Sequence, residues 1–395
     1  MKVFSFFSPK VKKLDKGQKE TLIWLTTFKN QHPEKKSVWM HCSSLGEFEQ
    51  GRMVLEGIKR SHPNVIIYLS FFSPSGYEIR KKDPIADFVF YLPLDTPLNA
   101  KMVATKLKPD LFILVKYDFW WNIIKTLQKQ GTFIYVVAAQ FKPNRYYYCP
   151  PFLPLMKKWA GIFTISDSSR LLLQKKGFQQ VFHVGDPRVD RVNQIKNNPI
   201  NIPQPLVSFC LSNHKLIVYG SVWLQDMIII KETIQTRTDW THLVVPHDIS
   251  KDNVNKICQH LPKEHTLYSS GTFDKNVVVI DHIGLLSGLY QYAFMAYIGG
   301  GFSLGIHNIL EPAIFGIPVA FGPKYKSFSE AVELIRLQCA FSVTSSDQFK
   351  QFLNVIYYDK IKYESISNAI GKYFDDHLGA SDKIIDHLKQ ENILV

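Results

Sequence analysis

The chain has 395 residues, which is more than one ordinary hydrophobic core needs and suits two domains of about 150–200 residues each. Hydrophobic residues make up 46% of it and charged residues 21%, so the composition excludes a disordered or fibrous protein. The 47 basic residues exceed the 34 acidic ones and give a formal charge of +13. A positive charge of this size attracts anions, so the possible partners include nucleic acid, an anionic membrane surface and a phosphorylated substrate.

The first part of the chain, residues 1–36, is a basic leader. It carries nine lysines against three acidic residues, so it is a candidate for contact with an anionic membrane surface. A solvated, partly disordered leader is the other interpretation of the same charges. The apolar stretch Val3–Phe7 is too short for the core of a signal peptide, so secretion is not expected.

Short runs rich in β-branched and aromatic residues then recur, with amphipathic segments between them, which is the pattern of a parallel sheet with helices on both faces. Residues 37–195 form the first predicted domain, with strands at Val38–Cys42, Val65–Ser70, Phe88–Tyr91, Leu111–Val115, Phe133–Ala139, Gly161–Ile165 and Val181–Gly185. Residues 196–214, rich in Asn and Pro, are predicted to be a linker. Residues 215–375 form the second domain, with strands at Leu216–Gly220, Thr241–Pro246, Val277–Ile280, Met295–Gly299, Pro318–Gly322 and Ala340–Val343, and a helix at 376–395 ends the chain.

The sequence thus predicts an α/β protein with two Rossmann-like domains facing across a cleft, where ligands bind beyond the carboxyl ends of the strands. The stretch Ile283–Leu310 has no charged residue apart from His307 and is long enough to suggest a membrane span, but its six glycines indicate a buried helix, a strand and a glycine loop. The five cysteines are scattered and have no CxxC spacing, which favours a reducing cytoplasm and excludes a structural zinc site.

Glu47 follows the first strand, in the segment Ser43-Ser44-Leu45-Gly46-Glu47-Phe48, and a helical pattern begins there. A carboxylate at such a turn projects toward the ligand, and partial burial would raise its pKa toward the value that a general base needs. The other interpretation is structural, because Ser43 or Ser44 can cap the helix and an acid in the first turn is favoured by the helix dipole.

Two further strand ends carry polar residues. The segment Ser73-Pro74-Ser75-Gly76 opens a helix, where its amides are candidates to hold a phosphate, although a plain turn stabilised by serine hydroxyls needs no ligand. Lys116, Asp118 and Trp120 follow the fourth strand, where a charged and aromatic cluster is a candidate for binding, although tryptophans often simply pack.

The most specific pattern is the glycine loop Gly299–Gly305, followed by His307-Asn308-Ile309-Leu310-Glu311-Pro312. Glycines after a strand allow a close backbone approach to a ligand, and the next helix presents free amides to a phosphate. Pro312 suits the first position of that helix, which would leave the Glu311 carboxylate just outside it and free to bind the two hydroxyls of a ribose. A capping role is the alternative for Asn308.

Together these motifs resemble the transferases of Kdo (3-deoxy-D-manno-oct-2-ulosonic acid), a family of inverting glycosyltransferases of the GT-B architecture. The resemblance covers about residues 38–339 and rests on His41–Glu47, Ser73–Gly76, Asp118–Trp120, Gly220-Ser221 and His307–Pro312. It implies that residues 37–195 bind the acceptor and residues 215–375 the nucleotide sugar.

The resemblance implies that Glu47 is the general base and Glu311 the nucleotide-binding glutamate. Kdo would pass from CMP-Kdo to a lipid A precursor, lipid IVA, with no cofactor and no metal ion. The expected donor-binding residues are Gly220, Ser221, His247, Gly300, Gly301, His307, Asn308 and Glu311, and the expected acceptor-binding residues are Ser44, Ser73, Ser75, Lys116 and Asp118. The expected location is the cytoplasmic face of the bacterial inner membrane, either peripheral or through a short N-terminal anchor.

The chain departs from the family pattern in three places. Lys116 and Asp118 stand where many members have glutamates, and Trp121 stands where proline is common, so an altered acceptor contact is expected. Many members begin with a transmembrane anchor, of which only the lysine-rich tail Phe6–Lys16 is evident here. The alternatives are a GT-B transferase that uses another nucleotide sugar and, from charge alone, a basic nucleic-acid-binding protein; no recognition motif supports the latter, so nucleic acid is not an expected partner.

Overall fold

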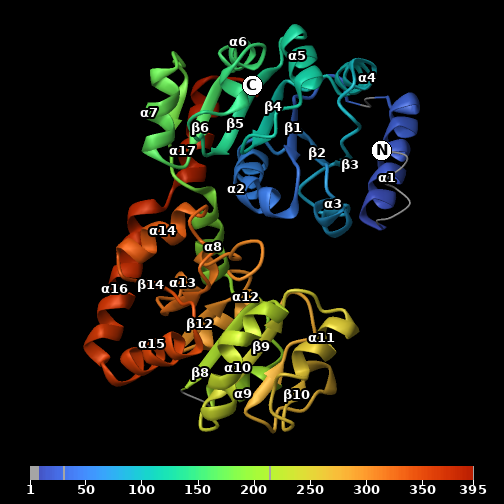
Figure 1. The fold of residues 1–395 in the computed structure, drawn as a ribbon. Helices are drawn as coiled ribbons and strands as arrows, with labels where there is room; N and C mark the ends of the chain where they lie inside the picture. The colour runs from blue at the N-terminus through green and yellow to red at the C-terminus, as the bar shows by residue number, and fades with distance from the viewer. Residues whose placement is uncertain (1–8, 30–31, 213–214, 395) are drawn as a thin grey trace. The chain divides into compact units, whose positions relative to one another are not determined.

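The computed structural model describes residues 9–29, 32–212 and 215–394, so the apolar stretch Val3–Phe7 lies outside the described residues. The chain divides into two compact units, each with its own sheet (Figure 1). Unit 1 comprises Met1–Arg191 and His377–Val395, and unit 2 comprises Val192–Asp376. Both ends of the chain therefore belong to the same unit.

Unit 1 is built on a sheet of seven parallel strands in the order β3-β2-β1-β4-β5-β6-β7. The strands are β1 (Ser37–Cys42), β2 (Ile66–Phe71), β3 (Phe88–Tyr91), β4 (Leu111–Val115), β5 (Phe133–Ala139), β6 (Gly161–Thr164) and β7 (Val181–His183). The helices are α1 (Pro9–Thr27), α2 (Leu45–Ser61), α3 (Pro74–Arg80), α4 (Pro97–Leu107), α5 (Trp121–Lys129), α6 (Phe152–Met156), α7 (Asp167–Lys175), α8 (Pro187–Asn197) and α17 (Ala380–Gln390).

Apolar side chains cover both faces of this sheet, as a doubly wound fold requires. Val38 and Met40 of β1 pack in one cluster with residues of α2 and α17, whereas Trp39 packs on the opposite face with residues of α4 and α5. The C-terminal helix α17 belongs to this core: Asp190 accepts hydrogen bonds from the N–H groups of Gly379 (2.7 Å) and Ser381 (2.6 Å) at its start.

Unit 2 repeats the plan, with parallel strands in the order β10-β11-β9-β8-β12-β13-β14. The strands are β8 (Leu216–Val222), β9 (Thr241–Pro246), β10 (Thr266–Leu267), β11 (Val277–Val279), β12 (Met295–Ile298), β13 (Val319–Phe321) and β14 (Ala340–Ser342). The helices are α9 (Gln204–Leu211), α10 (Met227–Thr236), α11 (Lys251–Cys258), α12 (Leu286–Leu289), α13 (Leu310–Ala313), α14 (Ser329–Arg336), α15 (Ser346–Tyr358) and α16 (Lys360–His377).

The prediction of two doubly wound α/β domains is confirmed, and each of the thirteen predicted strands is present within two residues of its expected ends. The stretch Ile283–Leu310 contains α12, β12 and the glycine loop, as predicted. Strand β10 was not predicted: it has two half-buried residues at the sheet edge and therefore no apolar run. None of the helices within residues 9–29, 32–212 and 215–394 has the length and apolarity that crossing a bilayer needs.

Two boundary predictions need correction. The predicted linker 196–214 contains α9, with Leu206 and Cys210 buried, and the units divide inside α8, after Arg191. In the sequence, Pro203 and Pro205 suggest a linker, but they stand at the start of α9. Proline is favourable at the start of a helix, because the backbone N–H that it lacks would have no partner there.

The partly disordered interpretation of the leader is wrong for Pro9–Thr27, which form α1. This helix packs beside β3: Gln18 Nε2 donates to the carbonyl of Leu92 (2.8 Å), and Leu25 is fully buried. Its lysines lie on the exposed side, so the high charge of the segment is compatible with a packed helix.

Candidate functional site

The residues predicted around Glu47 converge at the carboxyl ends of three neighbouring strands of unit 1. Ser44 and Glu47 follow β1, Ser73 and Ser75 follow β2, and Lys116 and Asp118 follow β4. These strands are adjacent in the order β2-β1-β4, and the order reverses between β1 and β4. A doubly wound sheet binds its ligands at such a reversal, so the fold brings this predicted set together at the expected edge.

Glu47 lies in the first turn of α2, half-buried, with its carboxylate turned back onto the preceding loop. Ser43 N–H donates to Oε2 at 2.5 Å, and the N–H of Ser44 also donates to this carboxylate. The structural interpretation of Glu47 as a helix-start acid therefore describes part of its role. A carboxylate has about four acceptor positions, so two bound amides leave room for a substrate proton.

The electrostatics of Glu47 suit proton transfer. Burial, and next the negative charge of Asp118, raise its pKa to about 7, although Lys116 and the two backbone donors oppose the shift. Lys116 has a left-handed backbone (φ 66°), which is uncommon for a residue with a side chain and is a kind of strain that clusters at functional sites. Glu47 is therefore poised to accept a proton near neutral pH.

A chain of buried polar groups supports the loop in front of Glu47. His41 Nε2 lies 3.3 Å from the Ser43 hydroxyl, and His41 Nδ1 lies 2.8 Å from Ser70 Oγ, which also accepts from Trp39 Nε1 (2.8 Å). Burial lowers the pKa of His41 to about 3, so this imidazole is neutral at physiological pH. The serine that anchors Glu47 thus rests on fixed, uncharged partners.

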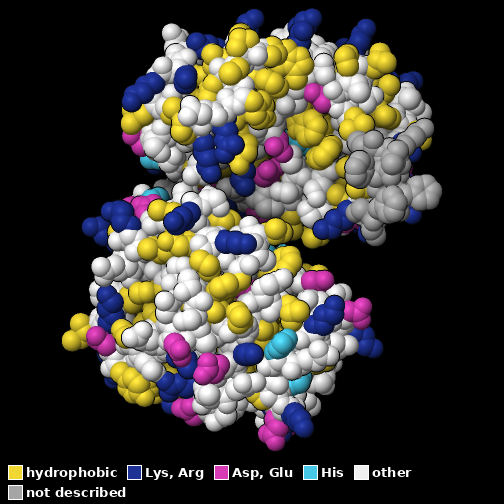
Figure 2. Space-filling view, in the orientation of Figure 1, with side chains coloured by type: hydrophobic (Ala, Val, Ile, Leu, Met, Phe, Trp, Pro, Cys, Tyr) yellow, Lys and Arg dark blue, Asp and Glu magenta, His cyan; other side chains and the backbone are white. Residues whose placement is uncertain are grey.

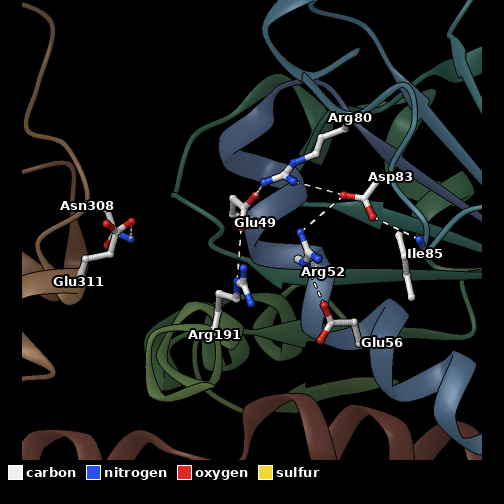
Figure 3. Close-up of polar contacts among 9 residues, drawn as sticks. All are labelled: Glu49, Arg52, Glu56, Arg80, Asp83, Ile85, Arg191, Asn308 and Glu311. Carbon is white, nitrogen blue, oxygen red and sulfur yellow. Dashed lines mark hydrogen bonds and ion pairs between the residues drawn. The ribbon is translucent and has the colours of Figure 1, made fainter. Parts of the chain in front are cut away.

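Helix α2, which carries Glu47, is fixed by a network of ion pairs (Figure 3). Asp83, whose side chain is only 2% exposed, joins the arginines of two helices and also accepts from Ile85 N–H (3.2 Å). The ion pairs are Glu49–Arg80 (2.7 Å), Arg80–Asp83 (3.3 Å), Asp83–Arg52 (3.5 Å), Arg52–Glu56 (2.7 Å) and Glu49–Arg191 (3.6 Å). Partly buried pairs that share partners fix geometry more firmly than isolated surface pairs.

The two serine-rich turns of unit 1 are joined. Ser73 N–H donates to the carbonyl of Ser43 (2.8 Å), and Ser73 Oγ accepts from Ser75 N–H (3.3 Å). The second contact is the serine turn that needs no ligand. Phosphate binding by Ser73 and Ser75 stays a prediction.

In unit 2, the predicted donor-binding residues also gather at strand ends. Gly220 and Ser221 lie at the end of β8, His247 directly follows β9, and the glycine loop follows β12. Strands β9, β8 and β12 are neighbours, and the order reverses between β8 and β12. Ser221 has a left-handed backbone (φ 52°), as Lys116 has in unit 1.

The glycines of this loop serve close packing between backbones. A Cβ on Gly299 would lie 2.3 Å from the carbonyl oxygen of Ser221, and Gly300 has φ 91°, which favours glycine. Asp226 fixes the loop: its carboxylate accepts from Gly300 N–H (2.9 Å), Trp223 N–H (2.9 Å) and Tyr297 Oη (3.1 Å). Burial raises the pKa of Asp226 in spite of these three donors.

Trp223, His247 and His307 form one assembly of aromatic rings. The planes of the Trp223 and His307 rings are nearly parallel (10°), and Trp223 Nε1 donates to His307 Nε2 at 2.8 Å. His247 stacks on both rings, with centroids 4.7 Å from Trp223 and 4.3 Å from His307, so it covers this hydrogen bond. Because an indole N–H can only donate, His307 must accept at Nε2 and carry its proton on Nδ1.

This tautomer has a consequence for ligands. Burial, and next the neighbouring His247, lower the pKa of His307 to about 4, so the ring is neutral at physiological pH. The Nδ1–H group has no hydrogen-bond partner in the described part of the chain. His307 therefore offers one neutral N–H donor beside the glycine loop.

Asn308 and Glu311 contact each other directly (Figure 3). Asn308 Nδ2 donates to Glu311 Oε1 (3.0 Å), and Asn308 Oδ1 accepts from Leu310 N–H (3.1 Å) in a turn just before the helix; the N-cap residue is Ile309, so Asn308 is not the N-cap. The prediction that Pro312 begins the helix is wrong: α13 starts at Leu310, which places Glu311 inside its first turn. The helix therefore starts two residues earlier than the proline suggested.

Two residues of this site were not predicted. Asp226 and Trp223 lie just beyond β8, and the only signal for Asp226 is a single acidic residue after an apolar strand. No local pattern marks Trp223, because its partner is 84 positions away. Within the described ranges, no three His, Cys, Asp or Glu side chains lie close enough together to hold a metal ion.

Two Rossmann-like units in one chain are the plan of the GT-B fold. Solved structures share this fold. The UDP-GlcNAc 2-epimerase from Neisseria meningitidis bound to UDP-GlcNAc has a TM-score of 0.64 and 15% identity, covering 90% of this chain and 100% of that one. A glycosyltransferase from Rickettsia africae has a TM-score of 0.55 and 11% identity, covering 90% and 98%.

The family model described as 3-deoxy-D-manno-octulosonic-acid transferase (kdotransferase) matches residues 16–191. The 3-deoxy-D-manno-octulosonic acid transferase of Aquifex aeolicus is 27% identical over 314 residues, covering 78% of this chain and 81% of that protein. The transferase of the same name from Haemophilus influenzae is 24% identical over 389 residues (90% and 87%). Over residues 16–191 the chain thus matches this family model, and over most of its length it is similar to 3-deoxy-D-manno-octulosonic acid transferases.

A bifunctional glycosyltransferase/methyltransferase of Fusobacterium nucleatum is also similar, with 26% identity over 383 residues. The match covers 92% of this chain but 58% of that protein.

The tautomer of His307 is directly testable. In ¹⁵N-histidine-labelled protein, we expect His307 to show a protonated Nδ1 and an unprotonated Nε2, and its signals are assigned by their loss in His307→Gln. Trp223→Phe keeps an aromatic ring but removes the donor, so both tautomers should become populated. Trp240→Phe is the matched control, because Trp240 is buried in unit 2 and its Nε1 has no hydrogen-bond partner. A protonated Nε2 in the unaltered protein would contradict the assignment.

Proposed function

We propose that the protein is an inverting glycosyltransferase that transfers Kdo from CMP-Kdo to a lipid A precursor, lipid IVA. The observation that carries this proposal is Glu47: a half-buried carboxylate with a pKa of about 7 at the strand-order reversal of unit 1. Sequence similarity supports the donor sugar, because the similar proteins carry the name 3-deoxy-D-manno-octulosonic acid transferase.

The proposed reaction is one displacement. Glu47 takes the proton of an acceptor hydroxyl, whose oxygen forms a bond to the anomeric carbon of Kdo. The bond from that carbon to the phosphate oxygen breaks, and CMP leaves with the electron pair. Because attack and departure occur on opposite sides of the carbon, the configuration inverts.

Unit 2 is the proposed donor unit. Glu311 lies in the first turn of α13, next to Asn308, where its carboxylate suits the two hydroxyls of the cytidine ribose. The Nδ1–H of His307 and the amides of the glycine loop are donors suited to the negative charge that develops on the leaving phosphate. No cofactor is part of the proposed mechanism.

The acceptor-binding roles of Ser44, Ser73, Ser75, Lys116 and Asp118 are proposals too. They are supported by position, since all five residues follow strands that flank Glu47. A lipid acceptor would place the protein at a membrane, and we propose the cytoplasmic face of the inner membrane. The exposed lysines of α1, among them Lys10, Lys12 and Lys13, suit an anionic surface there.

A transferase with a UDP-sugar donor is the second candidate, because the epimerase of similar fold is bound to UDP-GlcNAc. Direct titration with CMP and UDP separates the two, because the nucleotide of the true donor binds more tightly. The match of residues 16–191 to a transferase model favours either transferase over the nucleic-acid-binding alternative.

The activity itself has a direct assay. Purified protein with CMP-Kdo should release CMP in the presence of tetra-acylated lipid IVA, and release should fall to background without the acceptor. Glu47→Gln should lower turnover by roughly 10²–10⁴ and keep CMP affinity unchanged, because it removes only the base. Turnover of Glu47→Gln close to that of the unaltered protein would disprove the assignment of the base.

The pH dependence should follow the pKa of Glu47. A base must be deprotonated to act, so kcat/KM should rise with pH through about 7. Asp118→Asn removes a charge that raises this pKa and should move the rise to lower pH, whereas Lys116→Gln should move it to higher pH. Shifts of the same sign in both variants would count against this electrostatic account.

Glu311→Ala tests the donor site. Loss of charge-assisted hydrogen bonds to the ribose should cost roughly 1.5–3 kcal/mol, which is about a ten- to hundredfold loss of CMP affinity in a calorimetric titration. Glu333→Ala, which removes an acid from α14 of the same unit, should bind CMP normally. If Glu311 only stabilises the helix start, the variant will melt at a lower temperature and still bind CMP as before.

A further inference from the structure

A small hollow lies on unit 1 at the carboxyl ends of β4 and β5. In the sheet, β4 is the neighbour of β1, the strand that Glu47 follows along the chain. It encloses about 260 Å³. Two segments line it: Tyr117 and Asp118 follow β4, and Gln140, Lys142, Arg145, Tyr146 and Tyr147 follow β5. We refer to these seven residues as the β4–β5 hollow.

The floor of the hollow is packed firmly. Tyr147 is only 4% exposed and meets Phe119 and Phe141 edge to face, with ring centroids 5.6 and 5.4 Å away. Its hydroxyl accepts from Lys142 N–H (3.4 Å), which ties the start of the loop to its end. The loop after β5 therefore has a defined shape.

The charges in the hollow are not used by the fold. Lys142 and Arg145 are exposed, and neither forms an ion pair among the residues that the structure describes, whereas Arg52, Arg80 and Arg188 of the same unit are all paired with carboxylates. Figure 2 shows a cluster of lysine and arginine side chains on the visible face of unit 1. Two unpaired cations beside a packed aromatic floor leave a place for an anion.

Asp118 connects the hollow to the proposed base. Its negative charge contributes to the raised pKa of Glu47 and to the raised pKa of Tyr146; in both groups burial is the larger cause. Asp118 lines the hollow and lies close enough to Glu47 for its charge to act there, so the hollow and Glu47 are neighbours on unit 1. A ligand seated in the hollow would extend toward Glu47.

The chemistry of the lining defines the ligand. Tyr117 and Tyr146 are 43% and 62% exposed and offer flat apolar rings with a hydroxyl at one end, which suit a sugar. Arg and Lys are the side chains that bind phosphate, the first through a planar fork and the second as a point charge. The volume is below that of pockets for drug-sized molecules and fits about one sugar ring.

We propose that the β4–β5 hollow binds the phosphorylated sugar unit of the acceptor, with Lys142 and Arg145 on its phosphate. This inference rests on the proposed function and adds the acceptor group that is recognised. The loop thereby selects a phosphorylated glycolipid and holds it beside Glu47.

The experiment compares two proteins with two acceptors in detergent solution. Lys142→Gln/Arg145→Gln should raise the KM for phosphorylated lipid IVA at least tenfold and leave kcat and CMP affinity within twofold. With the enzymatically dephosphorylated acceptor, the variant and the unaltered protein should have the same KM. Arg60→Gln/Lys82→Gln is the matched control, because it removes one Arg and one Lys that are exposed on the same unit and form no ion pair in the described residues.

An equal rise in KM for both acceptors, or no rise with either, would overturn the proposal, as would an equal effect of the control. A second measurement is independent of turnover: calorimetric titration of each acceptor into Glu47→Gln protein, with and without the Lys142/Arg145 substitutions. If no protein releases CMP, the proposed function fails, and the binding data still decide whether the hollow distinguishes phosphorylated from dephosphorylated acceptor.

Discussion

The buried carboxylate of Asp226 holds together two loops at the strand ends of unit 2. It joins the turn after β8 to the loop after β12 by accepting the N–H groups of Trp223 and Gly300. Burying a carboxylate costs free energy unless its oxygens are hydrogen-bonded, and here three donors offset the cost. The arrangement of the loop, the ring assembly and the N–H donor of His307 depends on this contact, because Trp223 is fixed at its backbone by Asp226 and at its side chain by His307.

The two units use desolvation for opposite purposes. In unit 1, burial and a neighbouring acid make the charged form of Glu47 less favourable, so that this carboxylate can exchange a proton near neutrality. In unit 2, burial removes the positive charge of His307 and leaves a neutral donor. The environment of Glu47 suits proton transfer. The environment of His307 suits the binding of an anion, because the neutral ring donates a hydrogen bond and does not itself act as an acid.

The sequence predicted the fold well because parallel strands that are buried on both faces are continuous apolar runs. It located Glu47 and the glycine loop because each directly follows such a run. It could not find Asp226 or the Trp223–His307 hydrogen bond, since long-range pairing leaves no local pattern. The loop after β5 was also missed, because its role depends on Asp118, which lies on another strand end. Pro203 and Pro312 misled the boundaries because the first turn of a helix tolerates proline.

The return of the last helix, α17, to unit 1 affects how the chain matures. Gly57 of α2 lies against Ile385 so closely that a Cβ would be 2.7 Å from its Cγ1, and Ile384 and Leu388 complete the same core cluster. Unit 2 is contiguous and can complete its core on the ribosome, whereas unit 1 must wait until residues 377–395 have been synthesised. The half that carries Glu47 is thus begun first and finished last, so a chain truncated before residue 377 would keep a complete unit 2 and lack a completed unit 1.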